Sequence, residues 1–178
     1  LAVAGRVGDG VIIQLADPDV IGWIMDTARK AAEEVGRDPS ELECIVSAPS
    51  HISDDIADAR EQVRWFPAMV SNHVMDLVER YGADGSVIPG ALTDYVQARK
   101  FYDYDEHSRV GAKHGEFVTD EICDRFCVLG NAEQATAKLR ELESIGVNQF
   151  NIYLMTHGQE NDLAAYGRDI IPQFEAAA

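Results

Sequence analysis

The sequence predicts an α/β fold built on a parallel sheet. Three short apolar runs, each bounded by turn-forming residues, alternate with segments of helical periodicity. Alternating strands and helices indicate parallel strands joined by right-handed crossovers. The apolar runs show little polar alternation, which is typical of strands covered on both faces. The predicted strands are Val11–Leu15, Leu42–Ala48, which Pro49 is expected to end, and Val147–Met155.

Helices are predicted between these strands, where apolar residues recur every three or four positions. The first begins at Asp17 and Pro18, a carboxylate cap followed by proline, and ends at Gly36. A long second helix opens at residues 53–55, and we expect Pro67 to kink or split it. Further helices are predicted over residues 91–102, 119–126 and 161–174, and from Asn131 to Gly146 with a cap at Asn131 and Gln134.

Three strands with so many helices do not make a self-contained fold. A (β/α)8 barrel takes about 250 residues, and this chain has 178. We therefore expect the C-terminal portion of a TIM barrel, with about three βα units and a helical insertion at about residues 82–118. Residues 1–178 form one unit in this interpretation. Leu1–Ala4 would be the end of a crossover helix, and Gly5 a hinge before the first strand.

Charge and composition limit the classes of partner. The formal net charge is −16 and the pI is about 4.5, which argues against nucleic acid because phosphate binding needs clustered basic residues. No apolar run reaches the roughly 18–20 residues of a membrane span. The three cysteines are few and odd in number, which suits a reducing cytoplasm. Cys123 and Cys127, at i,i+4 spacing, are predicted to pack in the core.

Four stretches resemble, in order, motifs of one family. They are AGRVGDGVIIQ (Ala4–Gln14), AAEEVGRDPSELE (Ala31–Glu43), VLGNAEQATAKLRELESIGVNQFNIYL (Val128–Leu154) and YGRDIIPQF (Tyr166–Phe174). They are similar to segments of bacterial-luciferase-like oxidoreductases, and most similar to the F420-dependent, methylenetetrahydromethanopterin-reductase-like branch. Gly8 stands where the family usually has alanine. About half of the family's chain, with barrel strands one to five, has no counterpart here.

The resemblance implies an oxidoreductase that transfers a hydride between a cofactor and a small organic substrate. The cofactor would be the deazaflavin coenzyme F420, or alternatively FMN. The implied partners are the N-terminal half of the barrel and further copies in a homo-oligomer. In the family, the end of the first strand present here lines the cofactor ring. We therefore predict that Gln14, Leu15 and Ala16 bind the cofactor, the first by hydrogen bonding and the second by apolar contact.

Substrate-pocket candidates follow from position, because barrel enzymes carry their sites at the carboxyl ends of the strands. His51 and His157 end neighbouring predicted strands, and a histidine there could act as an acid or base. Tyr104 in the insertion is a third candidate. The glycines before the first strand are no dinucleotide fingerprint, since a phosphate-binding loop must follow a strand. No nucleophile motif is present, and the catalytic residues are left open.

Three alternatives remain. The chain could be a non-catalytic half-barrel module that pairs its open strand edges with another chain. It could belong to an FMN-dependent monooxygenase. A metal-dependent hydrolase using His51, His107, His114 and His157 is the third, although the spacing of these histidines matches no known ligand pattern and we expect no metal.

Overall fold

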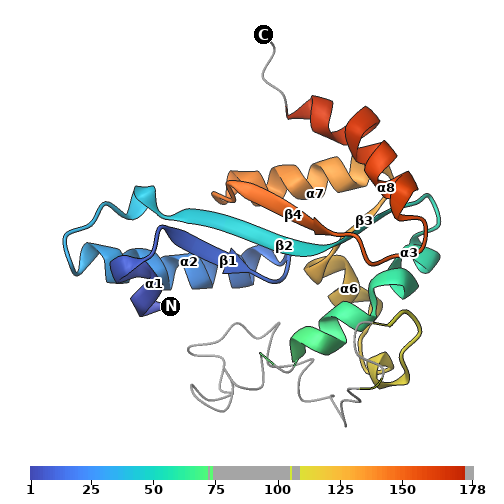
Figure 1. Cartoon of the computed structure of the whole chain (residues 1–178), viewed down its shortest axis with the longest axis horizontal. Coiled ribbons are helices and arrows are strands. Elements are labelled where there is room, and N and C mark those ends of the chain that lie inside the picture. Colours follow the sequence, from blue (N-terminus) through green and yellow to red (C-terminus); the bar gives the residue numbers. More distant parts are fainter. Residues whose placement is uncertain (72, 74–104, 106–108, 175–178) are drawn as a thin grey trace.

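The computed structural model describes residues 1–71, 73, 105 and 109–174, and shows a sheet of four parallel strands (Figure 1). The strands are β1 (Gly10–Ile13), β2 (Glu43–Ile52), β3 (Val128–Gly130) and β4 (Gln149–Tyr153). β2 pairs with the other three. The predicted α/β fold with parallel pairing is thus confirmed, with one strand more than the sequence indicated.

The register explains how one strand serves three partners. β1 pairs with the first half of β2, where Gly10 lies opposite Glu43. β4 pairs with the middle of β2, up to Pro49 opposite Tyr153. β3 pairs with its last residues, beginning with Ser50. The prediction that β2 ends at Pro49 is wrong. Pro49 lies between the stretches that pair with β1 and β3, so its missing N–H breaks no ladder bond on that side.

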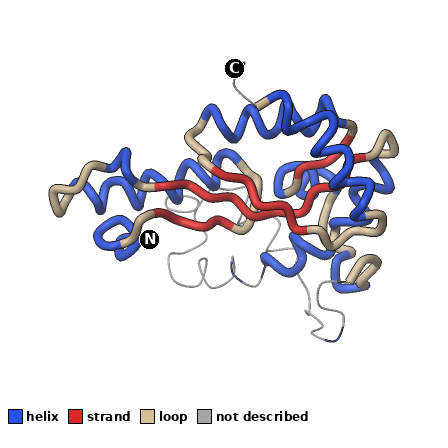
Figure 2. The backbone as a smooth tube through the Cα atoms, turned by 45° about the horizontal axis from the view of Figure 1, so that its top comes forward, coloured by secondary structure: helices blue, strands red, loops and turns tan. Residues whose placement is uncertain are grey.

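The helical segments lie around the sheet (Figure 2). The α-helices are α1 (Ala2–Val7), α2 (Pro18–Glu33), α3 (Ile56–Val63), α6 (Asp120–Phe126), α7 (Ala132–Ser144) and α8 (Gln159–Ala165). The π-helical turn Tyr166–Ile170 and the 3-10 turn Ile171–Gln173 continue α8, and 3-10 turns also form at Pro39–Glu41 and Lys113–Gly115. Within the described segments, no helix is long and apolar enough to cross a membrane.

Local signals placed the starts of α2 and α7 correctly, whereas α2 ends at Glu33, before the predicted Gly36. The Asp17 carboxylate accepts the backbone N–H groups of Asp19 and Val20 at the start of α2. Asn131 and Gln134 form the reciprocal capping box of α7. The second predicted helix is split, as expected from Pro67: α3 stops before Arg64, and residues 65–71 form a separate helical segment. The predicted helix over residues 91–102 and most of the predicted insertion lie outside the described residues.

Gly5 is not a hinge, and this expectation is corrected. It lies inside α1, where the helix packs closely on α2. A Cβ atom at Gly5 would lie 2.0 Å from the carbonyl oxygen of Ala28 and 3.0 Å from the Cβ of Ala31. Only glycine allows this approach of two helix backbones. Gly5 is therefore a packing residue inside α1, which continues to Val7.

A Gly5→Ala substitution is expected to destabilise the protein. The added methyl group forces α1 away from α2, and overpacking of this kind costs about 1–3 kcal/mol. The matched control is Gly22→Ala in α2, where a Cβ would meet nothing within 4 Å and better helix propensity should stabilise by about 0.5–1 kcal/mol. Urea unfolding of both variants checks the prediction, and equal midpoints for the two would contradict it.

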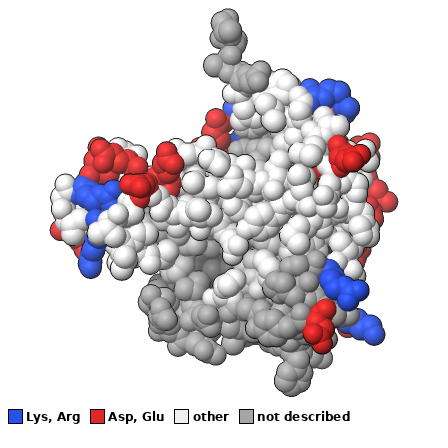
Figure 3. Space-filling view, in the orientation of Figure 1, with Lys and Arg blue, Asp and Glu red and all other residues white. Residues whose placement is uncertain are grey.

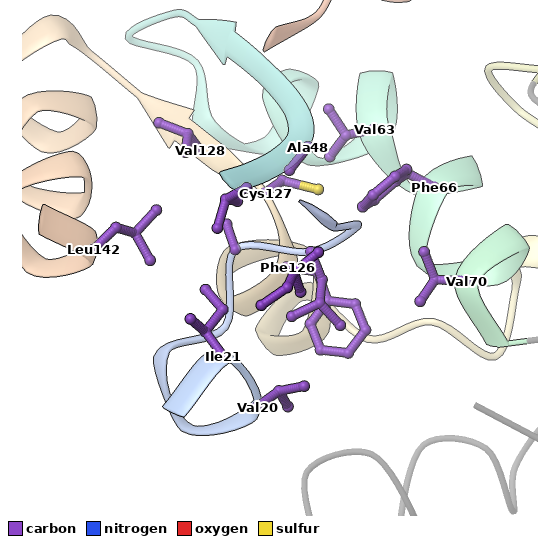
Figure 4. Close-up of a cluster of buried hydrophobic side chains, with 14 of the residues drawn as sticks. Val20, Ile21, Ala48, Val63, Phe66, Val70, Phe126, Cys127, Val128 and Leu142 are labelled. Atoms are coloured by element: carbon purple, nitrogen blue, oxygen red, sulfur yellow. The ribbon is translucent and has the colours of Figure 1, made fainter. Parts of the chain in front are cut away.

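The core lies between the sheet and its helices. Figure 4 shows Phe126 between α2, which carries Val20 and Ile21, and the helical segment that carries Phe66 and Val70. The cysteines belong to this core, as predicted for the pair in and after α6. Cys44, Cys123 and Cys127 are all buried and unbridged. Burial raises the pKa of Cys123 to about 12, so this thiol stays protonated and serves as packing.

Charged side chains avoid the middle of one face of the molecule. In the orientation of Figure 1, acidic and basic residues gather toward the two ends, and the surface over the middle of the sheet is mostly uncharged (Figure 3). Ile12 of β1 is 66% exposed. Its neighbour Ile13 is only 4% exposed, because alternate side chains of a strand point to opposite faces. One face of β1 therefore lies in the core, and the other is open.

Candidate functional site

Two polar side chains meet at the carboxyl end of the sheet. Gln14 directly follows β1, and Tyr153 is the last residue of β4. The Gln14 amide Nε2 donates a hydrogen bond to the Tyr153 hydroxyl at 2.8 Å. β2 pairs with both strands, so this bond reaches across the middle strand. The carboxyl ends of parallel strands are where α/β proteins bind ligands, and the two side chains mark this end.

Further polar residues follow the same face toward the amino end of β4. Asn151 lies opposite Ser47 of β2, and its Nδ2 donates to the Ser47 Oγ at 3.3 Å. The Gln149 Nε2 donates to the Asn151 Oδ1 at 2.6 Å. Strand alternation puts Gln149, Asn151 and Tyr153 on one face. A row of polar side chains thus runs along this face of β4, and the hydrogen-bonded pair formed by Gln14 and Tyr153 lies at its carboxyl end.

Aromatic contacts hold the Tyr153 ring in place. Its centroid is 5.8 Å from that of Phe66, and the rings are nearly perpendicular at 83°. Phe66 in turn packs edge to face on Trp65 at 5.7 Å, and both are almost completely buried. The Trp65 indole N–H donates to the Gln62 carbonyl. Buried rings locked in this geometry leave the tyrosine few rotamers, so its hydroxyl has a fixed position beside Gln14.

The three predicted cofactor residues have different surroundings. Gln14 is exposed on the open face. Leu15 is 5% exposed and Ala16 is fully buried, and the Ala16 N–H donates to the Phe126 carbonyl. The side chains of Leu15 and Ala16 therefore pack in the core, and of the three only Gln14 offers its side chain to a ligand. Tyr153 was missed, because its place beside Gln14 depends on the order of strands in the sheet.

His51, a predicted substrate-pocket residue, lies in a buried polar network at the end of β2. Its side chain is 11% exposed, and Nδ1 lies 3.2 Å from a carboxylate oxygen of Asp162 in α8. Its Nε2 lies 3.7 Å from the Asp58 carboxylate in α3. The hydrogen bond to Asp162 raises the pKa of His51 against the opposing effect of burial, and the charges of Asp162 and Asp58 add to the rise.

Asp162 is the centre of this network. It is fully buried, and it accepts hydrogen bonds from the Ile52 N–H and the Thr156 hydroxyl, both at 2.8 Å. Burial alone would raise the pKa of Asp162, but the hydrogen bonds from His51, Ile52 and Thr156 outweigh it, so the pKa lies below its usual value. The carboxylate ties α8 to the end of β2. This arrangement indicates a structural role for His51.

Of the remaining predicted pocket residues, the structure describes His157 alone. The His157 side chain is exposed, and its backbone N–H donates to the Gln62 side-chain oxygen at 2.9 Å. Tyr104 lies outside the described residues, as do His107 and the side chain of His114. Within the ranges that the structure describes, no three His, Cys, Asp or Glu side chains gather as a metal site would require.

The stability of the protein is expected to fall as the pH rises above neutrality. The raised pKa of His51 means that its pair with Asp162 contributes fully below the unfolded value of 6.5 and is lost as the pH passes the folded pKa. The lowered pKa of Asp162 sets the acid limit, since its contribution is lost as the pH falls below 3.8. We expect a loss of about 1 kcal/mol on the alkaline side.

Urea unfolding from pH 5.5 to 9 measures this dependence, and His51→Gln is the control. The glutamine keeps a polar side chain but cannot be protonated, so its unfolding free energy should vary less over this pH range. An identical pH profile for the wild type and His51→Gln would show that another group is responsible.

Comparison with known proteins supports the sequence resemblance. The family model described as luciferase-like monooxygenase matches residues 1–149. A 5,10-methylenetetrahydromethanopterin reductase from Methanolobus tindarius is 32% identical over 150 residues, which cover 84% of this chain and 43% of the relative. The corresponding reductase from Methanopyrus kandleri is 23% identical over 177 residues, or 98% of this chain and 48% of the relative. The chain thus spans about half the length of these relatives.

Solved structures agree on the fold. The coenzyme F420-dependent tetrahydromethanopterin reductase from Methanopyrus kandleri superposes with a TM-score of 0.66 at 21% identity, over 98% of this chain and 48% of that structure. An F420-dependent secondary alcohol dehydrogenase, solved with an F420–acetone adduct, gives 0.67 at 16% identity, over 98% and 46%. At these identities the likeness shows the fold, whereas the family rests on the match over residues 1–149: the chain belongs to the luciferase-like monooxygenase family.

Proposed function

We propose that this chain is the C-terminal part of a (β/α)8-barrel oxidoreductase that binds coenzyme F420 and transfers a hydride to or from a small organic substrate. The carboxyl ends of three parallel strands carry the proposal, because they bring Gln14 and Tyr153 together on the open face of the sheet. Two similar solved structures are named as F420-dependent, and one of them is a tetrahydromethanopterin reductase like the curated relatives, which favours F420 over FMN. The matching family is described as luciferase-like monooxygenase, so FMN is the alternative cofactor.

The residues at this edge fit a flat heterocyclic ring. Such a ring needs apolar contacts on its faces and a few fixed hydrogen bonds at its edge. Gln14 and Tyr153 supply the polar atoms. Met155, two residues after Tyr153 and 44% exposed, supplies an accessible apolar surface after the end of β4. When bound, a deazaflavin supplies a carbon that accepts and donates a hydride.

The role of this chain's residues is then placement. Gln14 and Tyr153 would orient the ring edge, and the buried pair Trp65–Phe66 would hold Tyr153 rigid. Neither side chain needs to form a covalent bond, which agrees with the lack of a nucleophile motif in the sequence. His51 is engaged by Asp162 and contributes to the rigidity of the site rather than to proton transfer.

The free edges of the sheet support a partner that completes the barrel. Within the described residues, β1 and β4 each pair with β2 alone, so each has one edge without a strand. Beside β4 lies an apolar cavity of about 290 Å³ between α7 and the turns that continue α8, lined by Leu139, Leu142, Phe150, Ile152, Ile170 and Phe174. An unpaired edge beside an apolar cavity suits another parallel strand and the helix that covers it. We expect these to come from the N-terminal half of the barrel.

Cofactor titration of the complete protein tests the proposal. We expect F420 to bind at micromolar concentration, followed by quenching of its fluorescence, and to bind more tightly than FMN. Gln14→Ala should raise the Kd about tenfold, the loss expected for one hydrogen bond. The matched control is Gln149→Ala, an exposed glutamine on the same face but at the amino end of β4, which should leave the Kd unchanged.

The possible outcomes separate the candidate functions. Tighter binding of FMN, with oxygen consumption on reduction, would favour the monooxygenase. Binding of neither cofactor to the complete protein would rule out the oxidoreductase and leave the half-barrel module. Size-exclusion chromatography of this chain alone tests the partner. A stable monomer with the same melting temperature as the complete protein would contradict a dependence on the N-terminal half.

A further inference from the structure

We propose that Tyr153 and Gln14 together form a two-point recognition site for the –CO–NH– edge of a planar heterocycle, with Tyr153 as a binding residue that the sequence did not reveal. This inference rests on the proposed function, because it assigns a part of the same site. It goes further in naming the atoms and the chemical group that they recognise.

The direction of the hydrogen bond defines which atoms remain available. The Gln14 amide donates through Nε2, so its carbonyl oxygen Oε1 is left to accept a hydrogen bond. The Tyr153 hydroxyl oxygen is the acceptor, so its own O–H is left to donate. One acceptor and one donor thus lie side by side at the carboxyl end of the sheet. A ligand edge with a neighbouring N–H and carbonyl complements both.

The rigidity of the tyrosine makes the pair selective. Its ring is held on Phe66, which is fully buried, whereas Gln14 is exposed and has three rotatable bonds of its own. The bond to a fixed hydroxyl restricts the amide before any ligand arrives. Ordering a side chain on binding costs about 0.5–1.5 kcal/mol, and Tyr153 removes much of that cost. The pyrimidinedione edge of flavins and deazaflavins carries the required N–H between two carbonyls.

A second tyrosine hydrogen bond among the described residues offers a comparison for this pair. On the helix-covered side, Tyr166 donates its hydroxyl to Ser50 inside the core, where both groups are buried. That bond is structural, since no ligand can reach it. Gln14 and Tyr153 form the corresponding bond on the open face, and within the described part of the chain the Gln14 Oε1 and the Tyr153 O–H have no further partner.

Binding of the isolated ring tests the inference in the complete protein. The probe is 8-hydroxy-5-deazariboflavin, the F420 ring without its phosphate tail, followed by fluorescence and by the shift of its absorption band. Tyr153→Phe removes the hydroxyl and keeps the ring on Phe66, and it should raise the Kd about tenfold and reduce the band shift. Tyr166→Phe is the matched control: it removes a buried hydroxyl, lowers the melting temperature and leaves the Kd unchanged.

A methylated probe separates edge recognition from a general loss of order. The N3-methyl form of the ring cannot donate to Gln14, so it should bind weakly to the wild type, and Tyr153→Phe should weaken it little further. If the wild type binds the ring and Tyr153→Phe binds it equally, or if N3-methylation has no effect, this assignment is wrong and the proposed function stands. If the wild type binds neither F420 nor the ring, both proposals fail.

Discussion

Replacing Asp162 by alanine is expected to be among the most damaging single changes, with a loss of about 3–5 kcal/mol in the free energy of unfolding. Asp162 is fully buried and accepts hydrogen bonds from Ile52 and Thr156, with His51 beside it. Its removal leaves a buried backbone N–H, a hydroxyl and an imidazole without their shared acceptor. The penalty for unpaired buried polar groups is larger than the value of the bonds themselves.

Asp58→Ala is the matched control, because this carboxylate also faces His51 but is 52% exposed at 3.7 Å. Exposed ion pairs contribute about 0–1 kcal/mol, so this variant should unfold close to the wild type. Asp162→Asn should fall between the two, since an amide keeps the acceptor oxygen but loses the charge. Urea unfolding at pH 7 measures all three. Equal losses for Asp162→Ala and Asp58→Ala would show that the buried network carries no special stability.

Most of the fold could be predicted because its signals are local. The apolar runs located β1, β2 and β4, and the caps at Asp17 and Asn131 depend on residues within three positions of each other. The split at Arg64, three residues before Pro67, follows from the N–H that this proline lacks. These features need no knowledge of distant parts of the chain, so composition and spacing were enough to place them.

Features that depend on pairing between distant segments were missed. β3 has three residues, too few for any periodicity, and it forms only because the end of β2 lies beside it. β2 runs past Pro49 for the same reason. Gly5 was interpreted as a hinge, since its contact with Ala28 cannot be seen in the local sequence.

The candidate site also has one residue that local signals identify and others that depend on distant parts of the chain. Gln14 was found from its position at the end of an apolar run. Tyr153 is 139 residues away along the chain, and its bond to Gln14 requires both strands to flank β2. His51 was predicted to face a substrate, but it is engaged by Asp162, 111 residues away. A loop histidine and a core histidine look alike in sequence, and only the tertiary partner distinguishes them.

Phe126→Ala should cost about as much as the loss of Asp162, for a different reason. The ring is fully buried between α2 and the helical segment of residues 65–71 (Figure 4), so truncation loses apolar burial and leaves a cavity, at about 3–5 kcal/mol. Phe117→Ala removes the same atoms from a partly buried ring at the edge of the core and should cost about half as much. Because packing carries no charge, the Phe126→Ala loss should be constant from pH 5.5 to 9, whereas the Asp162→Ala loss should shrink as His51 is deprotonated. Parallel pH profiles for the two variants would contradict this division of stability between packing and the polar network.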